Sequence, residues 1–287
     1  MSGKPSLNER LGYAASDRNL IVNCDDLGSS HAANVAAEAG MRYGLGTSAT
    51  LMVPCPWARE AVENCPDLDI GVHLTLTAEY PGYRWRALTA APSLHDAEGY
   101  MPFTPQEVWA KADLADVEAE CRAQIEQAYD WGLDITHLDV HMGTLQIEPR
   151  YFAIYLKLAV EFDLPMRMAG ASAQKQIGFP YREPALAAGR FFPDNFLFQW
   201  QRPTRELLLE RLPRLSPGVT ELCVHPVEDG PELRGYDKTN AEIRVGDHAC
   251  LFDEELKSIV AREGIRLIGF KPLRDLQRAD KPVLSRN

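Results

Sequence analysis

The chain has 287 residues, 45% of them hydrophobic and 25% charged, which is the composition of a folded globular protein rather than a disordered one. Thirty basic and 41 acidic side chains give a net charge of −11, which argues against nucleic acid or an anionic membrane as a partner. The N-terminus has no apolar stretch typical of a secretory signal, no segment is long enough to span a bilayer, and none of the six cysteines forms a C-x-x-C pair. We therefore expect a cytoplasmic protein with reduced thiols.

Short apolar runs alternate with helix-like segments along the whole chain. Strands are predicted, in chain order, at 20–24, 48–53, 69–74, 136–141, 164–168, 220–225 and 265–270. Helices are predicted between them, over 30–43, from Pro56 to the residue before Pro66, over 113–131, after Pro149, from about Thr204, and over 253–262. The segment 164–168 has the weakest strand pattern of the seven.

Two segments interrupt this alternation. Residues 78–112 carry many prolines, glycines and aromatics without a clear period, and a long connection of this kind is more often functional than passive. A capping box at Thr104–Glu107 is expected to restart helical structure at its end. Residues 227–250 are predicted to be a second irregular insertion, and 170–200 have no predicted structure.

Strands that alternate with helices form parallel sheets covered by helices. About seven such units without internal repeats or a linker predict an α/β fold, a deformed (β/α) TIM-like barrel with two long loop insertions. The whole chain, 1–287, is expected to form one catalytic domain with its core at about 19–275. An open doubly wound sheet is the alternative, although no G-x-G-x-x-G motif follows the first strand to indicate dinucleotide binding.

Polar side chains that can bind metals follow four of the predicted strands. In barrels and open α/β sheets the active site lies at the carboxyl ends of the strands, so these side chains are expected to meet. The motifs are Asn-Cys-Asp25-Asp26, Gly-Val-His73, His137-Leu-Asp139-Val-His141 and Val-His225-Pro.

Each motif taken alone has an ordinary structural explanation as well. Asp25 and Asp26 could cap a helix beside a turn, and a lone His73 on an apolar strand is more often a core residue than a ligand. Alternation places His137, Asp139 and His141 on one strand face, which is too polar for a sealed core unless its members bind one another or a metal. Pro226 keeps His225 extended at its strand end.

Taken together, the motifs favour a catalytic metal site. Two imidazoles and one carboxylate would leave open coordination positions for water and substrate. The remaining aspartate and histidine could supply a base and an acid for hydrolysis.

The ordered set NCDDLG, GVHLTLT, THLDVH and CVHP resembles the YdjC-like carbohydrate deacetylases of chitooligosaccharides and hopanoid sugars, which are similar in mechanism to the NodB-type polysaccharide deacetylases. The resemblance extends from Leu20 to about Phe270. It implies a deformed barrel with one divalent metal, without distinguishing Zn, Mg or Mn. One departure is Met142-Gly-Thr, where the family usually continues with further histidines, and this affects the expected sugar specificity more than the chemistry.

The resemblance also implies roles for individual residues. Asp26, His73 and His141 would be the metal ligands, Asp25 the general base and His225 the general acid. His137 and Asp139 would line or support the site. Independently of the resemblance, Arg167 at the end of the weak fifth strand could reach the same site and bind substrate, or it could be an ordinary surface arginine.

The implied reaction is hydrolysis of an N-acetyl group on an amino sugar, a linear amide that is not a peptide bond, with release of acetate. The expected partner is a small carbohydrate, and a homodimer is left open. Two alternatives remain: a metal-dependent hydrolase of another amide, ester or phosphate bond, and a sugar-binding barrel without catalysis.

Overall fold

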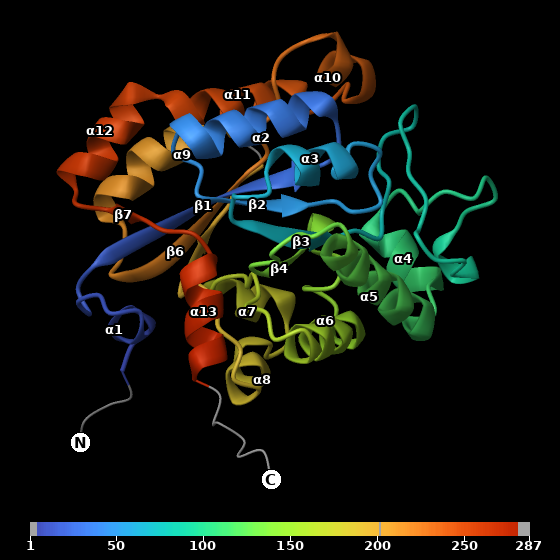
Figure 1. The fold of residues 1–287 in the computed structure, drawn as a ribbon, viewed down its shortest axis with the longest axis horizontal. Coiled ribbons are helices and arrows are strands. Elements are labelled where there is room, and N and C mark those ends of the chain that lie inside the picture. The colour runs from blue at the N-terminus through green and yellow to red at the C-terminus, as the bar shows by residue number, and fades with distance from the viewer. Residues whose placement is uncertain (1–4, 201, 281–287) are drawn as a thin grey trace.

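The computed structural model describes residues 5–200 and 202–280, and its strands form one sheet in which every pairing is parallel. The strands are β1 (Arg18–Leu27), β2 (Ser48–Leu51), β3 (Ile70–Leu74), β4 (Leu138–Val140), β5 (Asn195–Leu197), β6 (Gly218–Val224) and β7 (Arg266–Leu267). Their order is β4-β3-β2-β1-β6-β5, and β7 pairs with the first residues of β1. The seven parallel strands curl into the deformed TIM-like barrel that the sequence predicts (Figure 1).

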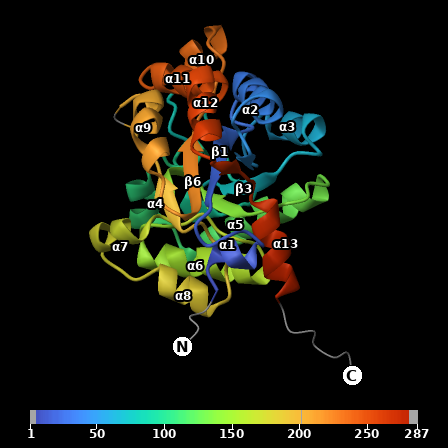
Figure 2. The same ribbon diagram turned by 90° about the vertical axis from the view of Figure 1, so that its left-hand side faces the viewer.

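Helices cover the outside of this curled sheet. Figure 1 shows α2, α9, α11 and α12 on one side of the strands and α5, α6, α7 and α8 on the other, and Figure 2 shows the same separation after a quarter turn. The longer helices are α2 (His31–Tyr43), α5 (Leu114–Asp130), α6 (Pro149–Glu161), α9 (Thr204–Arg211), α11 (Ala241–Phe252), α12 (Glu254–Arg262) and α13 (Lys271–Ala279). The shorter ones are α1 (Leu7–Arg10), α3 (Ala58–Asn64), α4 (Pro105–Lys111), α7 (Ala171–Ile177), α8 (Arg182–Ala187) and α10 (Pro231–Tyr236). No helix in the described part of the chain is long and apolar enough to cross a membrane.

Local sequence signals place several helix ends as predicted. The Ser30 side chain caps α2, and Thr104 and Glu107 form both hydrogen bonds of a capping box at the start of α4. Asp113 caps α5. Each side chain satisfies backbone N–H groups that the first turn of a helix leaves without partners.

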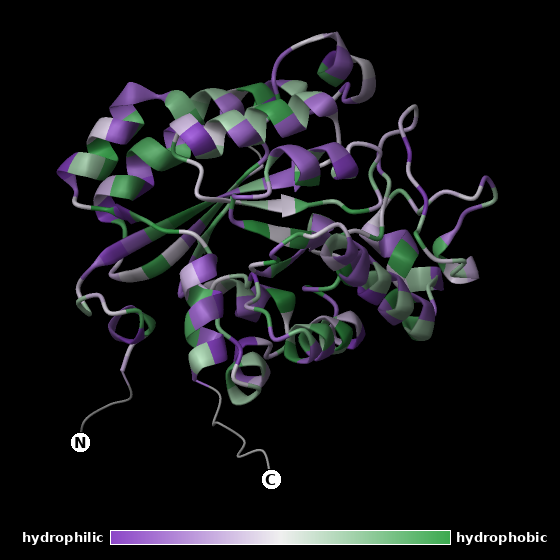
Figure 3. Cartoon of the chain, in the orientation of Figure 1, coloured by the Kyte–Doolittle hydropathy of each residue, from purple (hydrophilic) through white to green (hydrophobic). Residues whose placement is uncertain are grey.

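Hydrophobic and hydrophilic residues alternate along the strands (Figure 3). On β1, Leu20, Val22 and Cys24 belong to the main hydrophobic core with the helices. The intervening Asn23 faces inward and bonds the hydroxyls of Ser48 and Thr50 of β2. Because successive strand residues point to opposite faces, the apolar pattern that predicts the strands also fixes which polar residues enter the barrel.

Three predictions about the fold need correction. Residues 164–168 form no strand and contribute only an isolated bridge between Leu138 and Met166. The fifth strand is instead Asn195–Leu197, within the segment 170–200 for which the sequence predicts nothing and which also contains α7 and α8. The second insertion is helical rather than irregular, because α10 and α11 occupy most of it. The glycines of this segment and Pro231 conceal the helical period.

Candidate metal and catalytic site

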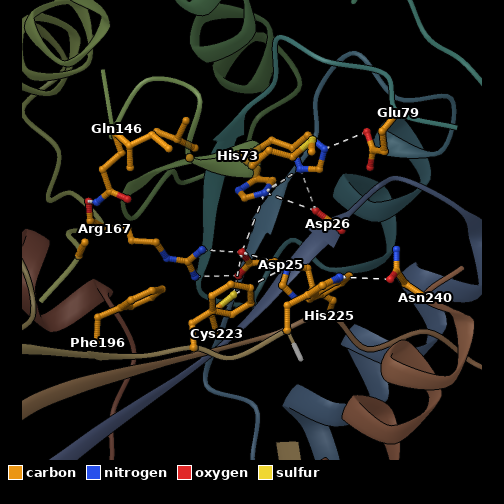
Figure 4. A pocket seen from close by; sticks show the side chains of 18 of the residues that line it. Asp25, Asp26, His73, Glu79, Gln146, Arg167, Phe196, Cys223, His225 and Asn240 are labelled. Atoms are coloured by element: carbon orange, nitrogen blue, oxygen red, sulfur yellow. Dashed lines mark hydrogen bonds and ion pairs between the residues drawn. The ribbon is translucent and has the colours of Figure 1, made fainter. Parts of the chain in front are cut away.

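A cavity of about 500 Å³ opens at the carboxyl ends of the strands (Figure 4). The structure brings six of the eight residues singled out in the sequence to its walls: Asp25, Asp26, His73, His141, Arg167 and His225. Asp139 lies behind this wall, fully buried against His73. His137 does not line the cavity.

Both carboxylates of the Asp25-Asp26 pair point toward the same imidazole, although neighbouring residues of a regular strand point apart. Asp26 has a φ of 64°, and the register of β1 against β2 shifts between Cys24 and Leu27. This left-handed residue, a conformation that aspartate tolerates better than most, turns the second carboxylate inward. The Nε2 atom of His73 is 3.3 Å from Asp26 Oδ1 and 4.0 Å from Asp25 Oδ2.

Three potential metal ligands form a nearly equilateral triangle. Asp26 Oδ1 is 3.3 Å from both His73 Nε2 and His141 Nδ1, and these two nitrogens are 3.3 Å apart. Donors at roughly 2.0–2.1 Å from a tetrahedral ion lie about 3.3–3.4 Å from one another. Among the described residues no donor forms a hydrogen bond to the buried Asp26 Oδ1, so the three residues fit one divalent cation.

A carboxylate contacts the outer nitrogen of each of the two histidines, the buried Asp139 behind His73 and the partly exposed Glu79 beside His141. His73 Nδ1 lies 2.7 Å from Asp139 Oδ2, and His141 Nε2 lies 3.1 Å from Glu79 Oε2. Burial alone would lower the pKa of each imidazole, but the carboxylates raise it to about 9 for His73 and about 10 for His141. This arrangement fixes which ring nitrogen faces the triangle, as is usual for histidines that ligate metals, and the negative surroundings favour a cation.

Replacing Glu79 with glutamine should lower the affinity for a divalent metal about 10- to 100-fold, the usual cost of losing a carboxylate behind a ligating histidine. A competition titration against a chelator measures this affinity. Glu98→Gln, at an exposed residue of the same insertion, is the control. Unchanged affinity in Glu79→Gln would show that Glu79 does not orient His141.

Arg244 on α11 holds the other oxygen of Asp26. Its Nη1 donates to Asp26 Oδ2 at 2.8 Å, its Nε to Asp237 at 3.0 Å and its Nη2 to the Tyr80 hydroxyl at 2.6 Å. Burial would raise the pKa of Asp26, but Arg244 and the imidazoles hold it well below its usual range. Asp26 therefore stays ionised and presents Oδ1 alone to the triangle.

Asp25 is held by four donors. Arg167 contacts both of its oxygens, at 2.5 and 2.7 Å. Asn23 Nδ2 donates to Oδ1 at 2.8 Å, and the Cys223 thiol donates to Oδ2 at 3.1 Å. A carboxylate fixed in this way at the cavity wall, beside the ligand triangle but outside it, is suited to act on a water molecule or a substrate proton.

Arg167 is the centre of a buried charge cluster beneath Asp25. Besides Asp25 it contacts Asp139 Oδ2 at 2.6 Å and, through Nε, Glu221 Oε1 at 2.6 Å. Glu221 is completely buried, and within the described part of the chain its second oxygen has no hydrogen-bond partner. Burial raises the pKa of Glu221 to about 8, so this side chain is mainly protonated at neutral pH.

This raised pKa predicts a pH-dependent difference between wild type and Glu221→Gln. Between pH 4.5 and about 8 the folded protein keeps the Glu221 proton that the unfolded chain releases. The free energy of unfolding of the wild type therefore falls as pH rises through this range. Glutamine does not titrate, so the variant lacks this pH dependence. Urea unfolding at pH 5 and pH 8 should show the variant gaining relative to wild type at the higher pH. A pH-independent difference would mean that Glu221 is ionised in the folded protein.

His225 lies on the same side of the cavity as Asp25. Its Nε2 is 3.9 Å from Asp25 Oδ2, and its backbone N–H donates to Asp247 at 2.7 Å. Its ring packs at a tilt against Phe198 and edge-to-face against Trp200, with ring centroids 5.8 and 4.7 Å apart. Burial lowers the pKa of His225. Asp247, on α11 like Arg244, therefore positions His225 through its backbone. The sequence did not indicate this role.

His137 shares the inward face of its strand with Asp139 but lies one layer deeper. Its ring stacks on Phe270, with centroids 3.7 Å apart, and its Nδ1 is 3.0 Å from the Thr136 hydroxyl. Gly71 leaves room for it, since a Cβ there would meet the ring at 2.5 Å. His137 thus packs the barrel floor below the site rather than lining it.

The aromatic residues Tyr80 and Trp85 of the first insertion are almost fully buried. Tyr80 packs against Trp85 and Tyr236, so neither ring has a free face for a sugar. Tyr80 still reaches the cavity wall, and the other aromatic side chains that line the cavity are Phe196, Phe198 and Trp200. Sequence reasoning missed Phe196, Phe198 and Trp200 because they lie on or just after β5, a strand that it placed elsewhere.

Comparisons with known proteins found relatives that match most of this chain in sequence and in fold. A family model described as YdjC-like protein matches residues 19–262. A carbohydrate deacetylase of Thermus thermophilus is 35% identical and covers 89% of this chain and 94% of its own length. One from Geobacillus stearothermophilus is 31% identical, with 88% and 97% covered. The crystal structure of a proposed cellobiose-phosphate cleavage protein from Enterococcus faecalis superposes with a TM-score of 0.80 at 28% identity, over 90% of this chain and 99% of that one. With its motifs, its barrel and a family match over most of its length, this chain belongs to the YdjC-like family.

Proposed function

We propose that the protein is a metal-dependent carbohydrate deacetylase, which hydrolyses the N-acetyl group of an amino sugar or oligosaccharide and releases acetate. The observation that carries this proposal is the arrangement in one cavity of a three-ligand triangle, a fixed carboxylate and an imidazole. The relatives named carbohydrate deacetylase support it. The expected partner is a small carbohydrate.

Each proposed role follows from a position in the cavity. Asp26, His73 and His141 would hold one divalent ion, and a bound ion would polarise the amide carbonyl and lower the pKa of water. Zinc and manganese suit two nitrogens and one oxygen by ligand softness, and magnesium remains a further choice.

Asp25 would accept a proton from the attacking water while Arg167 keeps its carboxylate in place. His225, whose backbone N–H is bound to Asp247, would then give a proton to the departing amine as the general acid. Because burial lowers the pKa of His225, it would regain its proton from the nearby Asp25, which has taken one from the water. Their reactive atoms are 3.9 Å apart, close enough to serve the same tetrahedral carbon. Each proton transfer contributes roughly 10²–10⁴-fold to the rate.

The test is acetate release from N-acetylated mono- and oligosaccharides, first with chelated protein and then after adding back Zn, Mn, Co or Mg. We expect activity to require the metal. His73→Ala and His141→Ala, assayed in parallel, should lose both the bound ion and the activity. Folded, metal-loaded protein that releases no acetate would favour another scissile bond. Activity that persists without any metal would contradict the proposed mechanism.

A further inference from the structure

One wall of the cavity carries three potential metal ligands that do not belong to the ligand triangle. Of the six cysteines, all of which lie in the described part of the chain, only Cys223 lines this cavity. Its Sγ is 3.1 Å from Asp25 Oδ2 and 3.9 Å from His225 Nε2, and that nitrogen is 3.9 Å from the same oxygen. Figure 4 shows the three side chains side by side.

Two neighbouring strands bring these side chains together. Cys223 and His225 are two residues apart at the carboxyl end of β6, so their side chains project from the same face. β6 pairs with β1 in parallel, with Val224 opposite Cys24. The next residue of β1 is Asp25, which therefore reaches the same part of the cavity as His225. The fold thus places a thiol, an imidazole and a carboxylate at one point.

The three separations suit a tetrahedral ion. With sulfur at about 2.3 Å and nitrogen or oxygen at about 2.0 Å from zinc, two ligand atoms lie roughly 3.3–3.6 Å from each other. The observed values of 3.1, 3.9 and 3.9 Å lie on both sides of this range. Small rotations of the Cys223 and His225 side chains would bring all three atoms to it. The cavity in front of them leaves the fourth position to water.

The charges of these groups suit a divalent ion that prefers sulfur. Burial raises the pKa of the Cys223 thiol well above its usual value and lowers that of His225. The incoming ion therefore takes the place of the thiol proton, which now lies between Sγ and Asp25 Oδ2. The resulting thiolate and the carboxylate match the double positive charge, while Arg167 keeps its contact with Asp139. Zinc binds thiolate strongly, whereas magnesium and manganese prefer oxygen.

We propose that Asp25, Cys223 and His225 form a second metal site, which binds zinc or a similarly thiolate-seeking ion when that ion is in excess and thereby inhibits the enzyme. The thiol proton passes to solvent as the sulfur–metal bond forms. The inhibition rests on the proposed function, because the ion would occupy the oxygen of the base and the nitrogen of the acid. Arg167, which also holds Asp25, makes this site weaker than the ligand triangle.

Cobalt(II) reports the thiolate ligand directly, because a cobalt–thiolate bond gives a near-ultraviolet charge-transfer band that imidazole and carboxylate ligands do not give. Titration of chelated wild type with cobalt should produce this band and load two ions per chain. Cys223→Ser, which keeps a hydroxyl donor beside Asp25, should lose the band and one ion. Cys65→Ser, at a buried thiol at the end of α3, is the matched control and should keep both.

His73→Ala tests whether the two sites are separate. It removes a ligand of the triangle and should lose one ion, but it should keep the charge-transfer band. Circular dichroism checks the fold of each variant. A wild type that binds a single ion without the band, or a band that persists in Cys223→Ser, would overturn the second site.

Inhibition is measured as acetate release at increasing zinc concentration, relative to the highest rate of each variant. Wild type should be activated by the first equivalent of zinc and inhibited by excess zinc, but not by excess magnesium or manganese. In Cys223→Ser, half-inhibition should need at least about 10- to 100-fold more zinc, since the loss of a residue behind a metal ligand already costs that much affinity. Equal inhibition of wild type and Cys223→Ser would reject the assignment.

The cobalt spectra separate this inference from the proposed reaction. A band that Cys223→Ser abolishes, without acetate release from any sugar, would keep the second site and reject the deacetylase. Acetate release from a protein that never shows the band would keep the deacetylase and reject the second site.

Discussion

Replacing Asp25 with asparagine should lower kcat by about 10²–10⁴-fold, the usual contribution of a general base, without lowering the content of bound metal. Asp25 Oδ2 is 4.0 Å from His73 Nε2, whereas the three atoms of the ligand triangle are 3.3 Å apart. Asparagine has nearly the same shape but cannot accept the proton of an attacking water. Steady-state acetate release and metal analysis of the same purified sample measure the two quantities.

The neighbouring residue provides the matched control. Asp26→Asn changes the same chemical group one position along the chain, but it removes the oxygen that completes the triangle. We therefore expect it to lose both metal and activity. If both variants lost the metal equally, the division of the pair into a base and a ligand would be wrong. If Asp25→Asn kept full activity, the base would be another group.

The functional residues at the carboxyl ends of the strands could be predicted because each follows an apolar run that forms a strand. Asp25, His73 and His141 are far apart in the sequence, but the carboxyl ends of parallel strands lie at one edge of the sheet, so these side chains were expected to lie close together. The same reasoning gave the parallel barrel, since alternating strands and helices have few other ways to bury their apolar faces.

The supporting residues could not be predicted in the same way. Arg244 and Asp247 lie on α11, in a segment whose glycines and charges resemble a loop, and Glu79 lies in a stretch without regular structure. Their roles depend on which buried carboxylate or imidazole they meet after folding. The positive φ of Asp26 likewise depends on the register shift of β1, which no local pattern reveals.

Arg167→Met should cost about 3–5 kcal/mol of stability, the range for removing one partner of a buried ion pair. Arg167 is fully buried and contacts three carboxyl groups, those of Asp25, Asp139 and Glu221. Methionine fills much of the volume of the arginine stem, but it removes the positive charge that pairs with the buried carboxylates of Asp25 and Asp139. Denaturant unfolding measures the loss. Arg59→Met, at an exposed pair on α3, should change stability little.

Glu221→Gln distinguishes which carboxylates cause that cost. Burial keeps Glu221 protonated at pH 5, so at this pH the single glutamine variant should remain close to wild type in stability, whereas at higher pH it gains on wild type. The variants are therefore compared at pH 5. Adding it to Arg167→Met should restore little, because the uncompensated charges are those of Asp25 and Asp139. Substantial rescue by Glu221→Gln would show instead that Glu221 is ionised and that its pairing with Arg167 holds the cluster together. In either case acetate release should stay low in Arg167→Met, since Asp25 loses the donor that fixes both of its oxygens.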